Sequence, residues 1–312
     1  MISVVFPTYN VEKYVINSLE SIIQQTYADF ELIIVDDGSV DNTVKICTEI
    51  LTKTKINWKL LKQENHGQST ARNCGLKVCK GEYVVFVDSD DILSKNFLSA
   101  LISAINILDC NMVFCDFTYD LRYLRSDNSL NYEVQNIEAK EMLDFFLYRK
   151  REIIIPAFLY RKNFLIDNNI YFRENVRFSE DQLFLWECFI KNVKPILFYK
   201  EKLYFYLKHP KSIMTSSVRD RIESGYIGLK MLIDELQFCN YKNMHFIEPR
   251  WIIGALYSAA KYLKYDDFIY LYKTMNAEHC FKRLASFGDM KAELTAFIAI
   301  FPHLFYGLFQ KI

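Results

Sequence analysis

The sequence predicts an α/β fold, in which a mostly parallel sheet is flanked by helices and followed by a helical C-terminal region. In roughly the first 116 residues, short apolar runs alternate with stretches whose apolar residues recur at helical spacing. This alternation implies right-handed βαβ units, which build parallel sheets. After Asp116 this alternation of strand and helix patterns ends. The longest periodic stretches there, 219–239 and 249–272, have the apolar spacing of helices.

Composition limits the functions that the chain can have. Its 312 residues are 51% hydrophobic, which suits one large domain or two smaller ones. The formal net charge is zero, so nucleic acid is not an expected partner. We expect no signal peptide, and no stretch offers the ~20 apolar residues of a membrane-spanning helix. The eight cysteines lack Cys-x-x-Cys pairs and zinc spacing, which indicates reduced, mostly buried thiols of a cytosolic protein.

Short runs of β-branched and aromatic residues mark the expected strands. Tyr83–Val87 is apolar at every position, which is typical of a central strand buried on both faces. Pro7 is expected to end the first strand, because proline cannot donate to a strand ladder. The expected strands are Ile2–Phe6, Glu31–Val35, Trp58–Leu61, Tyr83–Val87 and Met112–Cys115.

Helical patterns fill the intervals between these strands and the region after them. Val11–Gln25, for example, has apolar residues at positions 11, 15, 19, 22 and 23. Asp120–Asn136 is polar and is expected to form a loop. The other expected helices are the stretch from the Ser39–Asn42 turn to Leu51, Ser69–Val78, Phe97–Leu108, Lys140–Tyr148, Asp181–Ile190, 219–239 and 249–272.

Carboxylates gather after two of the expected strands. The carboxyl ends of parallel strands lie on one edge of a sheet, and open α/β sheets bind ligands there. Carboxylates clustered at such an edge repel one another unless a cation lies between them, so we expect a hard divalent cation, Mn²⁺ or Mg²⁺. The carboxylates at this edge are Asp36, Asp37, Asp88, Asp90 and Asp91.

A structural alternative exists for the last three of these positions. Ser89, Asp90 and Asp91 precede a helix expected to start near Ser94, and such residues commonly cap helices. Capping explains one carboxylate in each loop, but it does not explain pairs on two loops. No Gly-x-Gly-x-x-Gly and no Gly-Lys-Ser/Thr phosphate loop occurs, so a dinucleotide site and a P-loop are not expected.

Four motifs occur in order in the first 91 residues: Val-Val-Phe-Pro-Thr-Tyr-Asn (4–10), Ile-Val-Asp-Asp-Gly-Ser-Val-Asp (34–41), Asn-His-Gly-Gln-Ser-Thr-Ala-Arg-Asn-Cys-Gly (65–75) and Gly-Glu-Tyr-Val-Val-Phe-Val-Asp-Ser-Asp-Asp (81–91). With these four motifs the chain resembles the family 2 glycosyltransferases of GT-A fold, which build bacterial surface polysaccharides. The match covers roughly the first 115 residues, and Val40 stands where the family usually has Thr. Later in the chain the match is thinner and rests on Ser-Glu-Asp (179–181) and residues 206–213.

The resemblance implies a Rossmann-like GT-A domain that binds a UDP-sugar. Asp36 would accept a hydrogen bond from uracil, and Gly67 would let the base approach closely. Arg72 would lie near the ribose or the diphosphate, the alternative being an arginine on the helix surface, and Asp88 would contact the ribose. The residues expected to bind the nucleotide-sugar are Pro7, Thr8, Tyr9, Asn10, Asp36, Gly67, Arg72, Asp88 and Ser89.

The resemblance also implies a metal site and a general base. Asp90 would bind Mn²⁺ or Mg²⁺ at the diphosphate, and His209, in a basic segment expected to close over the diphosphate, would be a further metal ligand. The alternative for His209 is a surface turn before Pro210. Asp181 would take the proton of the acceptor hydroxyl in an inverting transfer. The alternative for Glu180 and Asp181 is an ordinary acidic pair favoured by the helix dipole.

The implied enzyme moves a hexose or N-acetylhexosamine from a UDP-sugar to a growing, lipid-linked bacterial glycan. It would serve capsule, exopolysaccharide or lipopolysaccharide assembly at the cytoplasmic face of the cell membrane. We expect a nucleotide-sugar half over 1–116, an acceptor-side part over 117–215 and a helical region over 216–312. The C-terminal segment 296–309, 14 residues and nearly all apolar, either packs on the core or makes a peripheral membrane contact.

Two other functions remain open at this stage. A sugar-phosphate nucleotidyltransferase shares this type of sheet, but its Gly-rich, Arg-containing opening loop is missing here. An inactive partner subunit that only binds nucleotide is the non-enzyme alternative, and the presence of Asp90 and Asp181 argues against it.

Overall fold

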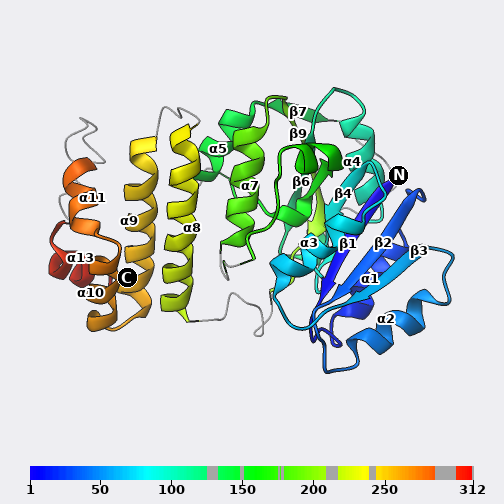
Figure 1. The fold of residues 1–312 in the computed structure, drawn as a ribbon, viewed down its shortest axis with the longest axis horizontal. Helices are drawn as coiled ribbons and strands as arrows, with labels where there is room; N and C mark the ends of the chain where they lie inside the picture. Colours follow the sequence, from blue (N-terminus) through cyan, green and yellow to red (C-terminus); the bar gives the residue numbers. More distant parts are fainter. Residues whose placement is uncertain are drawn as a thin grey trace. The chain divides into compact units, whose positions relative to one another are not determined.

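The computed structural model describes residues 1–124, 133–147, 151–174, 176, 179–208, 217–238, 244–284 and 300–310. They form two compact units along the chain (Figure 1). Unit 1 comprises Met1–Asn175 and Phe184–His209, and unit 2 comprises Val176–Leu183 and Pro210–Ile312.

Unit 1 is built on a nine-stranded mixed sheet, drawn as arrows in Figure 1. The strands are β1 (Ile2–Thr8), β2 (Phe30–Asp36), β3 (Asn57–Lys62), β4 (Tyr83–Phe86), β5 (Ile92–Leu93), β6 (Met112–Thr118), β7 (Val134–Ile137), β8 (Phe158–Arg161) and β9 (Ile196–Phe205). Their order is β3-β2-β1-β4-β8-β6-β9-β5, and β7 pairs with β9.

Strand directions place many carboxyl ends on one edge of this sheet. β1 pairs in parallel with β2 and β4, and β2 pairs in parallel with β3, as the sequence predicts. β8 is antiparallel to both β4 and β6, so β6 points the same way as β4, and β9 is parallel to β6. The carboxyl ends of β1, β2, β3, β4, β6 and β9 therefore share one edge, called here the strand-end edge.

The expected stop of β1 at Pro7 is wrong. Pro7 lies opposite Val35 of β2, and β1 continues to Thr8. Pairing with β4 ends earlier, at Val5 opposite Phe86, so only one neighbouring strand pairs with Pro7. A proline is tolerated at such a position because just one side of the strand needs ladder hydrogen bonds.

Four of the nine strands, β5, β7, β8 and β9, are not among those expected from the sequence. β5 has two residues and β7 has four, too few for an alternating pattern to stand out. β5 lies between the Asp88–Asp91 loop and the next helix, which begins at Phe97 and is preceded by Asn96. The alternative that Ser89, Asp90 and Asp91 cap this helix is therefore wrong.

Helices cover both faces of the unit 1 sheet. Leu19, Leu51 and Leu98 pack in one cluster with the face of β1 that carries Val4. The opposite face meets the helix that carries Gly75, where an added Cβ would lie 2.4 Å from Val5 Cγ1, so that close approach needs glycine. The helices of unit 1 are α1 (Val15–Ile23), α2 (Thr43–Leu51), α3 (Gln68–Val78), α4 (Phe97–Ile105), α5 (Ala139–Leu147) and α6 (Lys162–Asp167), and α7 (Glu180–Lys191) has its first residues in unit 2.

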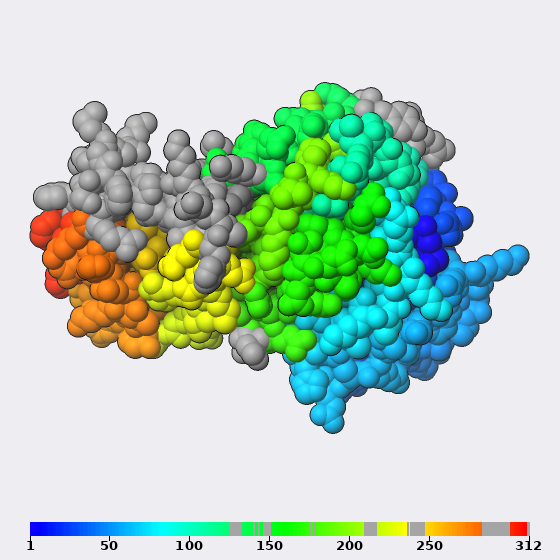
Figure 2. Space-filling view, turned by 45° about the horizontal axis from the view of Figure 1, so that its top comes forward, coloured from blue at the N-terminus to red at the C-terminus, as the bar shows by residue number. Residues whose placement is uncertain are grey.

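Unit 2 is helical (Figure 1), and the outer surface of its helices is coloured from yellow to red in Figure 2. These helices share one core of buried side chains. The single helix expected over 249–272 is wrong, because the backbone is extended at Lys264 (φ −71°, ψ 158°) and divides it. Leu256 and Phe268 lie on either side of this break and pack in the same cluster, so the apolar pattern runs through it. The helices are α8 (Val218–Phe238), α9 (Met244–Tyr262), α10 (Tyr265–Thr274), α11 (Ala277–Leu284) and α13 (Pro302–Phe309).

The C-terminal helix α13 has one buried face and one exposed face. Phe305 and Tyr306 pack in the unit 2 core, whereas Leu304 and Leu308 are 55% and 48% exposed. The start of the apolar segment, 296–299, lies outside the described residues. Among the helices of the described residues, none is both long enough and apolar enough to cross a bilayer.

Candidate active site

The loops after β1 and β2 are bonded to each other at the strand-end edge. Asp36 Oδ1 accepts a hydrogen bond from Thr8 Oγ1 (3.3 Å), and Asp36 Oδ2 accepts one from the Ser39 N–H (3.2 Å). Asn10, with a positive φ of 51°, donates its N–H to Ser39 Oγ (3.0 Å) and accepts from the Val40 N–H (2.9 Å). These bonds hold Asp36, which is 3% exposed, at the end of β2.

The neighbouring Pro7 and Tyr9 differ in exposure. Pro7 is buried within β1, and Tyr9 is 47% exposed just beyond the strand. Tyr9 is therefore the large side chain of the first loop that a ligand can reach from solvent.

Asp37 shapes the loop that ends at Gly67. Its Oδ1 accepts hydrogen bonds from Gln63 Nε2 (2.7 Å) and the His66 N–H (2.9 Å), and its Oδ2 accepts one from the Gly67 N–H (2.9 Å). The sequence placed Asp37 in the carboxylate cluster without a role of its own. The structure gives it one, because its carboxylate brings the start of α3 next to the end of β2.

Gly67 combines an unusual backbone with open space. It has a φ of +92° and immediately precedes α3, and apart from Gly67 and its two chain neighbours no heavy atom of the described residues lies within 4 Å of a Cβ built there. The glycine is thus needed for its backbone conformation, and it leaves room for a ligand beside the loop.

We expect Gly67→Ala to lower the free energy of unfolding by ~1–3 kcal/mol, the usual cost of a non-glycine residue in this backbone region. Urea denaturation measures it. Gly307→Ala is the matched control, since Gly307 also has open space around an added Cβ but lies in helix α13. The control should be neutral or stabilising by up to ~1 kcal/mol, and equal losses in the two variants would contradict the backbone argument.

Asp88 is held by two donors from α3. Arg72 Nη2 and Gln68 Nε2 both donate to Asp88 Oδ1, at 2.7 and 2.8 Å. The Arg72 side chain is 0% exposed and that of Asp88 is 18% exposed. The alternative of a surface arginine is therefore wrong. Arg72 is buried, and its guanidinium is bonded to Asp88 at the strand-end edge. Gln68 is a further residue of the candidate site, through its bond to Asp88, and the sequence did not single it out.

Asp91 fastens the end of β9 to the same edge. Its Oδ2 accepts from Tyr204 Oη (2.6 Å), and its Oδ1 accepts from the Leu207 N–H (2.8 Å). Burial raises the pKa of the Asp91 carboxyl well above its usual value, and the charges of Asp88 and Asp90 add to this rise. Asp91 is thus a buried structural carboxylate, and its pKa is raised first by burial and then by the negative charges of Asp88 and Asp90.

The donor set at this edge fits a divalent cation held partly by a ligand. Asp90 is partly exposed, and Ser89 beside it is 6% exposed. Within the described ranges, no three or more His, Cys, Asp or Glu side chains are grouped so as to hold a metal ion. Mg²⁺ commonly takes one or two protein carboxylates plus substrate phosphates, so Asp90 with a bound diphosphate is a sufficient donor set. His209 lies outside the described residues.

Asp181 lies in the first turn of α7, as the sequence predicts. It is partly exposed, whereas its neighbour Glu180 is 8% exposed. Both residues belong to unit 2, whereas the strand-end residues described above belong to unit 1. Of this acidic pair, Asp181 is thus the one whose side chain is more accessible.

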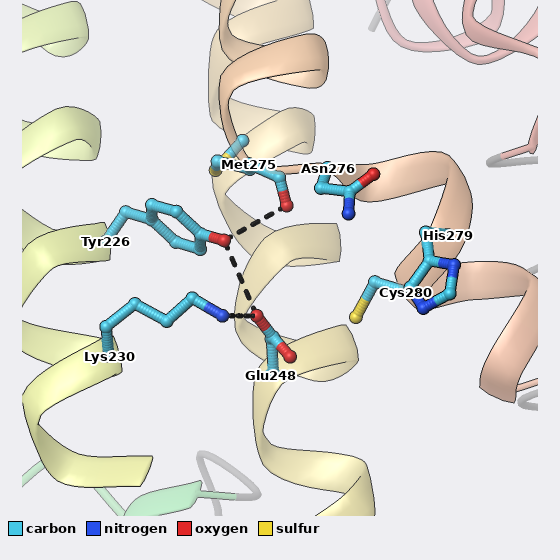
Figure 3. A pocket seen from close by; sticks show the side chains of 7 residues that line it. All are labelled: Tyr226, Lys230, Glu248, Met275, Asn276, His279 and Cys280. Carbon is cyan, nitrogen blue, oxygen red and sulfur yellow. Dashed lines mark hydrogen bonds and ion pairs between the residues drawn. The ribbon is translucent and has the colours of Figure 1, made fainter. Parts of the chain in front are cut away.

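A separate hollow lies among the helices of unit 2 (Figure 3). Its polar groups bond to one another: Glu248 Oε1 accepts from Lys230 Nζ at 2.5 Å, and Tyr226 Oη donates to the Met275 carbonyl at 3.1 Å. It contains none of the strand-end residues. The lining residues are Tyr226, Lys230, Glu248, Met275, Asn276, His279 and Cys280.

Comparison with known proteins gives a family and a fold. The family model described as "Glycosyl transferase family 2" matches residues 3–171, more than half of the chain. Glycosyltransferase GlyG of Streptococcus pneumoniae is 32% identical over 226 residues, which are 69% of this chain and 73% of GlyG. The uncharacterized glycosyltransferase EpsJ of Bacillus subtilis is 30% identical, with 68% of this chain and 62% of EpsJ covered.

A third relative is also represented among solved structures. Poly(ribitol-phosphate) beta-N-acetylglucosaminyltransferase TarS of Staphylococcus aureus is 29% identical over 78% of this chain, and the chain spans 42% of TarS. Residues 1–349 of S. aureus TarS in complex with UDP-GlcNAc superpose with a TM-score of 0.66 at 22% identity, over 99% of this chain and 92% of that one. Mannosyltransferase PcManGT of Pyrobaculum calidifontis, in complex with GDP-Man and Mn²⁺, gives 0.55 at 14% identity, over 96% and 86%. The predicted GT-A fold, with its helical C-terminal region, is confirmed.

Proposed function

The chain belongs to glycosyl transferase family 2, and from this premise we propose that it is an inverting, metal-dependent enzyme with a UDP-sugar as donor. The sugar would be a hexose or an N-acetylhexosamine. The acceptor would be a growing, lipid-linked bacterial surface glycan. One observation carries the proposal: the buried carboxylate of Asp36, the open space at Gly67 and the tethered carboxylate of Asp88 are all found at the strand-end edge.

The donor half of the proposed mechanism binds and orients the nucleotide. Asp36 accepts a hydrogen bond from the uracil N3–H, and Tyr9 and Gly67 border the base. Asp88, fixed by Gln68 and Arg72, accepts from the ribose hydroxyls. The solved complex of TarS with UDP-GlcNAc supports a uridine nucleotide as the donor group, because the two chains share the fold.

Asp90 would hold the divalent cation together with oxygens of the donor diphosphate. When bound, the cation neutralises the negative charge that develops on the departing UDP. The solved complex of PcManGT with GDP-Man and Mn²⁺ supports this type of site in the fold.

The acceptor half of the mechanism needs a base. As the acceptor oxygen attacks the anomeric carbon, Asp181 takes the hydroxyl proton, and the bond from the sugar to UDP breaks. A single displacement of this kind inverts the configuration at the anomeric carbon. The partial exposure of Asp181 supports its selection over the more buried Glu180.

The proposed place of action is the cytoplasmic face of the cell membrane, in capsule, exopolysaccharide or lipopolysaccharide assembly. The exposed Leu304 and Leu308 of α13 support a peripheral contact with lipid. Cosedimentation with anionic vesicles tests the contact, and protein that stays entirely in the supernatant would contradict it.

A panel of donors tests the proposed activity directly. The purified chain is incubated with Mn²⁺ and UDP-, GDP- or CDP-sugars, and nucleotide release is measured with and without a lipid-linked glycan acceptor. We expect UDP release that depends on metal and is raised by acceptor. No release and no UDP binding from any donor would overturn the proposal, and UDP binding without release would favour an inactive partner subunit.

We expect Asp36→Ala to weaken UDP binding roughly 10- to 100-fold, because one hydrogen bond to a charged group is lost. Calorimetry with UDP and CDP measures it. Cytosine has no N3–H, so CDP affinity should change much less and the preference for UDP should shrink. Asp29→Ala is the control, since Asp29 precedes the same strand at its other end and is 67% exposed. Unchanged UDP affinity in Asp36→Ala would remove Asp36 from the site.

A further inference from the structure

We propose that Phe172 is a positioning residue of the donor site, because its ring holds the Arg72 guanidinium in the orientation that bonds Asp88. The inference rests on the proposed function, in which Asp88 contacts the nucleotide. Phe172 follows the strand-end motifs by many residues and belongs to none of them.

Arg72 lies between a carboxylate and an aromatic ring. Its Nη2 donates to Asp88 Oδ1 at 2.7 Å, and its Cζ lies 5.0 Å from the centre of the Phe172 ring. The two side chains are 0% and 2% exposed. A cation over a ring is held more strongly when water is excluded. The ring therefore limits the guanidinium to a narrow set of orientations. Because Arg72 donates a hydrogen bond to Asp88, the position of the Asp88 carboxylate is restricted as well.

Asn73, the next residue of α3, clamps the backbone of Phe172. Its Nδ2 donates to the Phe172 carbonyl at 2.8 Å, and its Oδ1 accepts from the Phe172 N–H at 2.9 Å. Asn73 is 3% exposed, and hydrogen bonds in such a dry place are costly to leave unmade. An amide side chain offers the donor and the acceptor that one residue's backbone needs. The position of the Phe172 ring is thus fixed to the same helix that carries Arg72.

Other rings support Phe172 away from the charge. Phe184 stacks on it with ring centres 4.0 Å apart and planes at 4°, and Phe86 meets it edge-on at 4.9 Å and 84°. These neighbours prevent the ring from turning away from Arg72. A leucine at 172 would keep apolar contact with both neighbours but would offer no flat face to the guanidinium.

The experiment measures UDP affinity by calorimetry for wild type and Phe172→Leu. We expect a loss of roughly 2- to 30-fold, the range of a guanidinium–ring contact. The donor KM should rise by a similar factor while kcat changes less. In an Arg72→Gln background, Phe172→Leu should add less than a twofold loss, because the cation that the ring holds is already gone.

Phe158→Leu is the matched control. Phe158 is 0% exposed and stacks with Phe114 and Tyr160, with ring centres at 4.8 and 5.6 Å. It should lose thermal stability as Phe172→Leu does, yet keep UDP affinity within twofold. If the leucine variant does not fold, Phe172→Met replaces it, since methionine also fills space without a ring.

Three results would each overturn the inference alone. The first is wild-type UDP affinity in Phe172→Leu, the second is an equal loss of affinity in the Phe158→Leu control, and the third is full additivity of Phe172→Leu with Arg72→Gln. A wild-type chain that binds no UDP would overturn the proposed function and this inference together, so the two failures can be told apart.

Discussion

Asp181→Asn is expected to lower turnover by ~10²–10⁴, the usual size of a general-base contribution. Asparagine keeps the shape of the side chain but cannot take the proton of the acceptor hydroxyl. UDP affinity and metal dependence should barely change, because in the proposed mechanism Asp181 acts on the acceptor. Single-turnover rates with saturating acceptor, together with UDP calorimetry, measure both quantities.

Glu180→Gln is the internal control for Asp181→Asn. Glu180 is the more buried of the pair, so its substitution should affect thermal stability more than turnover. If Glu180→Gln is the more damaging change for turnover, and Asp181→Asn stays near the wild-type rate, the base has been assigned to the wrong residue of the pair.

Asp90→Ala is expected to lower transfer by ~10²–10³, the range seen when one stabilising group is removed from a developing charge. It should weaken donor binding as well, which distinguishes it from Asp181→Asn. The fold should persist, because Asp90 is partly exposed and the change removes no core volume. Transfer assays over a range of Mn²⁺ concentrations, with circular dichroism as the folding check, measure these effects.

Asp109→Ala is the control for Asp90→Ala. Asp109 is 77% exposed and pairs with Lys194, so its loss should leave transfer near wild type. A chelator should abolish wild-type activity, and added Mn²⁺ should restore it. Full activity of Asp90→Ala, or of wild type in chelator, would rule out the metal role of Asp90.

The local pattern of apolar residues was sufficient to predict the parallel part of the sheet. β1 to β4 and α1 to α4 form near the predicted ranges because each strand is a short apolar run and each helix has its own apolar period. The strand-end edge follows from these elements alone, since parallel strands joined by helices must point the same way. The placement of Asp36, Asp88 and Asp90 on that edge could therefore be predicted from the sequence.

The sequence pattern did not predict the ends of strands and helices that are set by strand pairing or by packing. β1 runs through Pro7 because its pairing with β4 has already ended at Val5. The residues near Pro7 do not reveal where this pairing ends. The break between α9 and α10 at Lys264 is hidden because both helices use the same core, so the apolar period continues across it. Neither feature has a local signal.

The sequence by itself determined the family, the parallel strands and the carboxylates at the strand ends, because these depend on residues close together in the chain. Only the tertiary structure decided what each carboxylate contacts. Asp37 bonds the Gly67 loop, Asp88 bonds Arg72 and Gln68, and Asp91 bonds the end of β9. The physical reason is that these partners are 16 to 116 residues away in sequence, so their contacts arise from packing and not from local pattern.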